Sequence, residues 1–391
     1  MHAMLSGLAL LFLFGCSHQQ TKPQRVIPVL PQTSAHWFTT PSLQPELKQL
    51  FYLTPEQQQH FLQYFHSSAQ SHYSKEYRLY NYLQHKIADF SYEGKNYPAE
   101  QALEKLQGNC MTLALLTSAL AQLAGIETGY RVIHQEPMID YDQNIFISSN
   151  HIRTYLYKSI PAPEQGVLVL QRAALVIDYF PEKGNLAGDE ISAERFYAML
   201  YNNLAADALL SGNTDHVFHL SQKALSYDAS FTPSINMIAL MYHRKGALAE
   251  AAAWFDYGMQ QRDSRITLLS NYRDFALKTR DHQLLEKINQ QLINNNDDNP
   301  YAWLALAMDA ERNKQPQHAK RYYKKLLERA PYLHNANLAL IRLYLQENNY
   351  KSAQLLVEQA IQYAYEPERR KFYDTKLAAL KQHRENMQKT H

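Results

Sequence analysis

The sequence has almost no cysteine, and its basic residues form no long block. Cys16 and Cys110 are the two cysteines among 391 residues, and the net charge is +2. Nucleic acid is therefore a poor match as main partner, because domains that bind it carry basic stripes. Closely spaced Cys and His pairs, typical of zinc sites, are also missing. We expect neither a metal nor a cofactor.

The first apolar run is too short to span a bilayer as a helix. Residues 5–15 have the length of a signal-peptide core, and the run ends in the letters LFGC with Cys16 last. This ending resembles a bacterial lipobox, although the residues before the run include no Lys or Arg. The resemblance implies removal of residues 1–15 and diacylglycerol on the Cys16 sulfur. A plain secretory signal is the alternative.

Lipidation of Cys16 would set both the location and the redox state of the chain. Two acyl signals on one terminus give a stable anchor, and Ser17 after the cysteine is implied to favour the outer membrane. We expect a lipid-anchored protein of the bacterial envelope that faces the periplasm. Residues 16–40 would form a flexible tether, in which several prolines favour extended backbone. No intramolecular disulfide could then form, so the fold must rest on packing.

Helical patterns fill the first part of the domain predicted at residues 41–190. Thr54 and Gln57 have the spacing of a capping box around a helix start. Asn109 is placed to cap a strongly apolar helix at 111–124. Beyond it the apolar period shifts toward two, which is typical of strands, at residues 130–133, 151–157, 167–170 and 174–178. Helices followed by short strands predict an α+β domain with a mostly antiparallel sheet.

The second half of the chain repeats every 34 residues. The copies start near 198, 232, 266, 300 and 334, with small and large residues at matching positions such as Ala307, Ala319 and Trp303. The period and pattern resemble the tetratricopeptide repeat. Residues 191–391 are therefore predicted to form an all-α solenoid, closed by a polar cap helix near 368–386. The copy at 266 is degenerate: Arg273 and Asp274 mark either a partner site or sequence drift.

Cys110 has the setting of a nucleophile. It lies at a predicted helix start, where the helix dipole favours thiolate over thiol. Gly108 leaves room beside it for a substrate backbone, and the first N–H groups of the helix could form an oxyanion hole. The alternative is a buried cysteine acting as a small apolar residue.

Two further residues complete a nucleophile, base and orienter series. His151 opens a strand-like run, and Asp178 interrupts an apolar one, where a carboxylate is costly unless it is paired. His134, at the end of an earlier strand, is the competing base. A metal site built from Cys110, His151 and Asp178 lacks the usual ligand spacing.

Residues 45–185 resemble the bacterial transglutaminase-like superfamily, with its papain-type arrangement. The resemblance rests on Gly-Asn-Cys110 before the apolar helix, then Asn-His151-Ile and Val-Ile-Asp178 in the family's order. It implies Cys110 as nucleophile, His151 as general base and acid, and Asp178 as orienter of the imidazole. The position of a papain-type oxyanion glutamine falls near Glu104, and the superfamily includes inactive relatives used for binding. With an anchor and repeats, the chain is similar to a group of envelope lipoproteins.

Two functions are consistent with these features. The first is an envelope-anchored cysteine hydrolase or acyltransferase that acts on an amide or peptide bond through a thioester on Cys110. Its repeats would recruit a protein or peptide, either as substrate or as partner. The second is a scaffold without catalysis, in which the repeats and a transglutaminase-like recognition module mediate protein–protein interaction.

Overall fold

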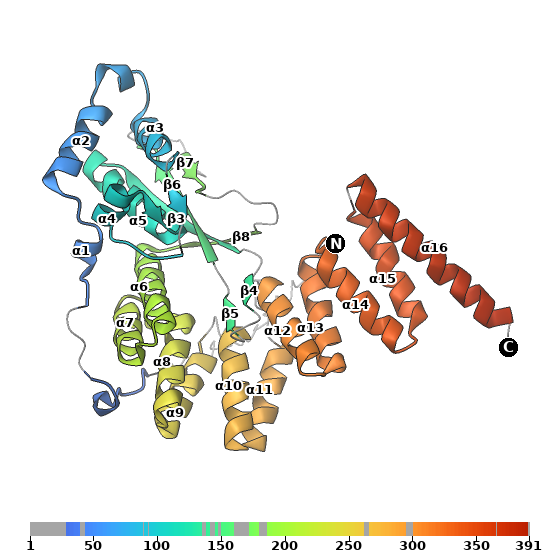
Figure 1. Cartoon of the computed structure of the whole chain (residues 1–391). Helices are drawn as coiled ribbons and strands as arrows, with labels where there is room; N and C mark the ends of the chain where they lie inside the picture. The colour runs from blue at the N-terminus through green and yellow to red at the C-terminus, as the bar shows by residue number, and fades with distance from the viewer. Residues whose placement is uncertain are drawn as a thin grey trace, which may run out of the picture.

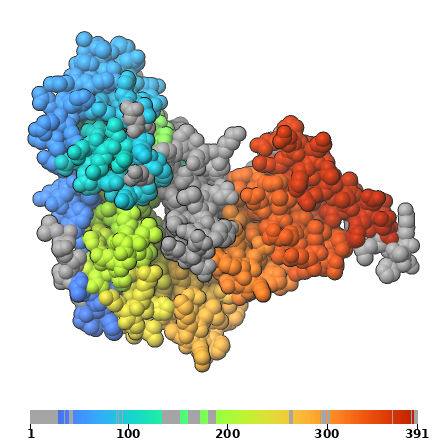
Figure 2. All heavy atoms as spheres, viewed as in Figure 1, coloured from blue at the N-terminus to red at the C-terminus, as the bar shows by residue number. Residues whose placement is uncertain are grey.

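An α+β domain stands on the first helix pair of an all-α solenoid (Figures 1 and 2). The computed structural model describes residues 29–39, 44–88, 90–92, 94–134, 138–140, 145–147, 150–159, 172–179, 186–261, 266–294, 300–364 and 366–389. Within these ranges, no helix combines the length and the apolar character needed to cross a membrane. The predicted signal sequence and Cys16 lie outside the described residues.

Five helices open the α+β domain. They are α1 (Leu47–Leu50), α2 (Pro55–Phe65), α3 (Lys75–Ile87), α4 (Ala99–Lys105) and α5 (Cys110–Ala124). The predicted capping box is confirmed, since the Thr54 hydroxyl accepts from the Gln57 N–H at 3.2 Å while Gln57 Oε1 accepts from the Thr54 N–H at 3.1 Å. These reciprocal bonds satisfy donors that the helix start would otherwise leave unpaired.

A four-stranded antiparallel sheet forms the other half of the domain. Its order is β7 (Ala174–Ile177), β6 (Asn150–Tyr157), β3 (Glu127–His134) and β8 (Leu186–Ile191). The antiparallel sheet was predicted, whereas β8 was missed because its sequence LAGDEI has no clear alternation. The predicted strand at 167–170 lies outside the described residues. Four further short strands form two pairs among the described residues: β1 (Ser91–Tyr92) with β2 (Gln107–Gly108), which are parallel, and β4 (Met138–Asp140) with β5 (Ile145–Ile147), which are antiparallel.

Helix α5 is the centre of this domain. Thirteen of its fifteen residues are buried, and it contacts the sheet on one side and helices α2, α3 and α4 on the other. A buried tyrosine ties it to the sheet: the Tyr179 hydroxyl lies 2.7 Å from Thr117 Oγ1 on α5 and 2.9 Å from Thr154 Oγ1 on β6. A helix that is apolar all round needs such cover, so the start of α5 is held in a fixed place.

Five antiparallel helix pairs and a long cap helix form the solenoid. The pairs are α6 (Ala193–Leu210) with α7 (Thr214–Tyr227), α8 (Thr232–Lys245) with α9 (Leu248–Met259), α10 (Ile266–Thr279) with α11 (His282–Asn294), α12 (Pro300–Arg312) with α13 (Pro316–Arg329), and α14 (His334–Gln346) with α15 (Tyr350–Gln362). Four of them begin at 232, 266, 300 and 334, the 34-residue step seen in the sequence. The first begins at Ala193 instead of 198, and the cap helix is α16 (Pro367–Lys389).

The repeat pattern is confirmed by burial. Ala307 and Ala319 are fully buried, and Trp303 and Tyr323 are 1% and 2% exposed. Small residues thus let the paired helices approach, while large ones fill the space between pairs. In the degenerate copy, Arg273 Nε donates to Asn289 Oδ1 at 3.1 Å, which links α10 to α11. Arg273 therefore has a structural role within the solenoid.

The predicted flexible tether needs a correction at its C-terminal end. Residues 34–39 and 44–46, which we call the N-terminal strap, lie against α6, α7, α8 and α9. Phe38 is 6% exposed and stacks on Phe218 with ring centroids 3.8 Å apart. Prolines and polar residues suggested a solvated linker, but the aromatic residue supplies apolar area that the repeats bury.

Candidate active site

Cys110 is the first residue of α5, as predicted. The Asn109 side chain caps the helix, its Oδ1 accepting from the Thr112 N–H at 2.9 Å. Before it, Gly108 has φ +146°, and a Cβ there would stand 2.5 Å from Thr112 Cγ2. Glycine is therefore required by the close packing of this turn against the helix, in addition to any access it gives a substrate.

The thiol of Cys110 is more enclosed than the sequence suggested. Cys110 is 5% exposed, and burial raises the pKa of its thiol to about 11, while N–H groups of Ile152, Met111 and Cys110 itself act to lower it. The amides of Met111 and Cys110 supply the lowering of the thiol pKa that was expected at a helix start. It is outweighed because desolvation penalises the thiolate more than the amides favour it.

His151 lies next to the residue whose amide is near the thiol. Its backbone belongs to β6 and pairs with Ile133 of β3, and the following amide, that of Ile152, is near enough to the Cys110 thiol to lower its pKa. The peptide group that joins His151 to Ile152 therefore lies near the thiol. The imidazole of His151 is outside what the structure describes.

Asp178 follows β7 on the neighbouring strand. Its Oδ2 accepts from Arg153 Nε at 2.7 Å and lies 2.6 Å from Arg153 Nη2, with both side chains about one-fifth to one-quarter exposed (19% and 27%). A partner for this carboxylate was expected from the sequence, but Arg153 was not foreseen in that role. The signal that could have found it is the spacing, because residues 151 and 153 are alternate positions of one strand.

Two other sequence-based candidates, His134 and Glu104, have defined places. His134 is the last residue of β3 and pairs with Asn150, the residue before His151 on β6. The backbone positions of the two candidate bases therefore do not favour one over the other. Glu104 lies on α4 and is exposed, so no side-chain oxyanion donor is found there. Across the described ranges, no group of three His, Cys, Asp or Glu residues could hold a metal ion.

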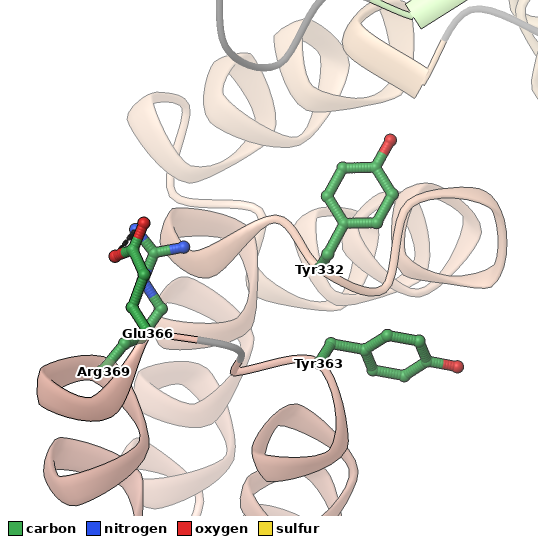
Figure 3. A pocket seen from close by; sticks show the side chains of 4 residues that line it. All are labelled: Tyr332, Tyr363, Glu366 and Arg369. Atoms are coloured by element: carbon green, nitrogen blue, oxygen red, sulfur yellow. Dashed lines mark ion pairs between the residues drawn. The ribbon is translucent and has the colours of Figure 1, made fainter.

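A hollow of about 340 Å³ lies at the other end of the molecule. It is lined by Tyr332, Tyr363 and Glu366, from the loops before α14 and α16, and by Arg369 of the first turn of α16. Figure 3 shows the two tyrosine rings on one side and the Glu366–Arg369 ion pair, 3.3 Å between Oε2 and Nη2, on the other. Figure 1 places these loops at the far end of the solenoid from α5. The hollow therefore cannot hold a substrate for Cys110.

Residues 59–151, from α2 through the first two residues of β6, match the family model of the transglutaminase-like superfamily. The chain contains a transglutaminase-like domain. The matched segment includes Cys110 and ends at His151, whereas Asp178 lies beyond it. The transglutaminase-like domain and the tetratricopeptide-type solenoid are thus two parts of one chain, the architecture that the sequence predicted.

Solved structures similar to this chain align with part of it. The peptide-binding tetratricopeptide protein YrrB is 17% identical, covering 46% of this chain and 92% of its own, with a TM-score of 0.25. PilF of Pseudomonas aeruginosa is 18% identical over 50% and 88%, with a TM-score of 0.30, and MamA is 14% identical over 43% and 92%, with a TM-score of 0.27. The repeat assignment here rests on the 34-residue helix spacing. No curated protein matches the chain.

Proposed function

We propose that this protein is an envelope-anchored cysteine hydrolase or acyltransferase that acts on an amide or peptide bond. The observation that carries the proposal is the packing of α5, which begins at Cys110, against β6, with the Ile152 amide next to His151 near enough to lower the pKa of the thiol. It brings the start of α5 and the start of β6 together, as the resemblance to the superfamily implies. Asp178 directly follows the neighbouring strand β7 and bonds to Arg153, which lies two residues after His151 on β6.

The proposed chemistry uses Cys110 as nucleophile and His151 as acid and base. The thiolate attacks the carbonyl carbon, the C–N bond breaks, and the imidazolium of His151 gives its proton to the leaving amine. Water or a second amine then attacks the thioester carbonyl and gives a proton to His151, and the C–S bond breaks to release the Cys110 thiolate. Water gives hydrolysis, and an amine gives transfer. Amides at the first turn of α5 would stabilise the oxyanion, and Asp178 would orient the imidazole.

The anchor and the repeats complete the proposal. Lipid on Cys16 would hold the chain at the outer membrane on the periplasmic side, and the solenoid would recruit a protein or peptide substrate. A Cys16→Ser variant is then expected in the soluble fraction of cell extracts. Membrane retention of that variant would contradict lipid as the sole attachment.

A second function, the scaffold without catalysis, is favoured by one specific observation. Burial raises the pKa of the Cys110 thiol to about 11, and a thiol of that kind is a poor nucleophile at neutral pH. In this alternative the α+β domain is a recognition module, and the repeats carry the partner.

The rate of Cys110 alkylation separates the two functions. The full chain with Cys16→Ser leaves Cys110 as the single thiol, and iodoacetamide is applied from pH 5 to 11. Fast labelling near neutral pH that is lost in His151→Ala supports the enzyme. Labelling that rises only above about pH 8.5, the ordinary thiol value, and ignores His151→Ala supports the scaffold. His134→Ala, made in parallel, shows which histidine acts as base.

A further inference from the structure

A chain of hydrogen bonds links the first repeat helix to the residue before Cys110. Asp207 of α6 accepts, through Oδ2, from the backbone N–H of Asn96 at 3.2 Å and from its Nδ2 at 2.9 Å. Asn96 Oδ1 in turn accepts from Asn109 Nδ2 at 2.9 Å. Asn109 then uses its own Oδ1 to cap α5. Asp207 and Asn109 are 98 residues apart by their numbers, yet two side-chain contacts join them.

The direction of each bond in this chain is set by Asp207. An ionised carboxylate can only accept, so the amide of Asn96 must turn its NH₂ group toward Asp207 and its oxygen toward Asn109. Asn109 must then present its NH₂ group to Asn96, which leaves its oxygen for the helix start. The cap of α5 needs that oxygen, because the amide of Thr112 is a donor.

Because Asn109 is buried, the orientation of its side-chain amide is fixed at the end of the hydrogen-bond chain near Cys110. Asn109 is 7% exposed, and its Nδ2 also reaches the Gly94 carbonyl at 3.3 Å. A flipped amide would place its NH₂ group against the Thr112 N–H, with no water to relieve the clash of donors. The same loop is fixed a second time, since the Tyr97 N–H donates to Thr112 Oγ1 at 3.0 Å.

We infer that Asp207 of the first repeat is a positioning residue for Cys110, acting through Asn96 and Asn109. The inference rests on the proposed function, and it makes the solenoid part of the support of the active site. A partner that displaces α6 would loosen the first turn of α5 through the same bonds.

Three variants of the Cys16→Ser full chain test this inference. Asp207→Ala removes the acceptor, Asp207→Asn keeps one carbonyl oxygen as acceptor, and Asp215→Ala removes an acid of α7 that bonds the strap instead. In Asp207→Ala, hydrogen exchange of the Thr112 amide should be faster by about tenfold or more. The pH profile of Cys110 alkylation should move to that of an ordinary thiol and ignore His151→Ala. Asp207→Asn should restore both properties, and Asp215→Ala should change neither.

Wild-type exchange at Thr112 together with a wild-type alkylation profile in Asp207→Ala would overturn the inference. If Asp207→Ala fails to fold, Asn96→Ala breaks the same chain without touching α6 and takes its place with the same expected and contradicting results. Hydrogen exchange does not depend on catalysis. A wild-type thiol that labels only at high pH therefore sinks the proposed function, while the exchange data still decide the role of Asp207.

Discussion

Helix α5 and the repeat helices bury their residues in opposite ways. Thirteen of fifteen residues of α5 are buried, whereas α13 buries Ala319, Tyr322, Tyr323 and Leu326 along one side and leaves most of its basic residues at the surface. The transglutaminase-like domain thus depends on one central helix. The solenoid divides its stability among neighbouring pairs, as repeat proteins do. A fixed site therefore depends on one central element, whereas an extended surface can be built from similar neighbouring units.

The largest expected effect comes from replacing a buried leucine with alanine in α5 or in the repeat helix α13, because each change leaves a cavity. Leu115 of α5 and Leu326 of α13 are both fully buried, and each Leu→Ala change should cost roughly 2–5 kcal/mol locally. Leu115→Ala should lower hydrogen-exchange protection throughout the α+β domain, and Leu326→Ala only in α12, α13 and α14. Equal loss of protection along the whole chain in either variant would remove the contrast between the two parts.

Release of the N-terminal strap is the next effect in size. Phe38 stacks on Phe218 and meets the edge of Tyr242, with centroids 5.2 Å apart. Phe38→Ala should weaken strap binding by about 1.5–3 kcal/mol, the value of burying such a side chain, and speed proteolysis of the strap. Val29→Ala, at a site 89% exposed, is the matched control. Unchanged proteolysis of Phe38→Ala would mean that the strap is held by its polar contacts alone.

Two asparagine caps allow a direct comparison of the two parts. Asn109 caps α5 and Asn349 caps α15, each through Oδ1 to the amide three residues on, that of Thr112 or Ser352. Either Asn→Ala change should cost about 1 kcal/mol in urea unfolding. Asn109→Ala should also alter the alkylation rate of Cys110, and Asn349→Ala should not. Identical alkylation in both variants would show that the cap does not position the thiol.

The smallest expected effect is a loss of hydrogen-exchange protection in the strap at low pH. Hydrogen bonds from Lys245 and Thr39 lower the pKa of Asp215 to about 2 from its ordinary value of 3.8. A depressed carboxyl pKa stabilises the folded form above its unfolded value, and that stability is lost as the pH falls through the folded one. Strap protection in hydrogen exchange should therefore weaken between about pH 4 and 2. Asp215→Asn should remove this pH dependence, and a strap that weakens equally in the variant would assign the effect to other groups.

The fold followed from the sequence where the signal was local and repeated. The 34-residue period located four helix starts, and the Thr54 and Asn109 caps were placed correctly. Strand β8 and the packing of the strap were missed because both depend on partners distant in the chain. Local propensity carries no information about such partners.

The site was predictable in its parts and not in its environment. The sequence placed Cys110 at a helix start, and the structure has it there, whereas the role of Asp178 toward the imidazole of His151 stays a prediction. The burial of the thiol and the identity of Arg153 depend on how α5, β6 and β7 pack together. The link from Asp207 to Asn109 was equally hidden, since it joins two domains through a loop residue.

The most direct test of the central claim is the fate of an acyl group placed on Cys110. The full chain with Cys16→Ser is mixed with excess p-nitrophenyl acetate, and nitrophenol release is followed together with the intact mass. Cys110 should become acetylated, and nitrophenol release should continue beyond one equivalent, because His151 activates water for deacylation. In His151→Ala the protein should remain acetylated after about one equivalent. Release by Cys110→Ala as fast as by the parent, or no acetylation of Cys110, would contradict the account.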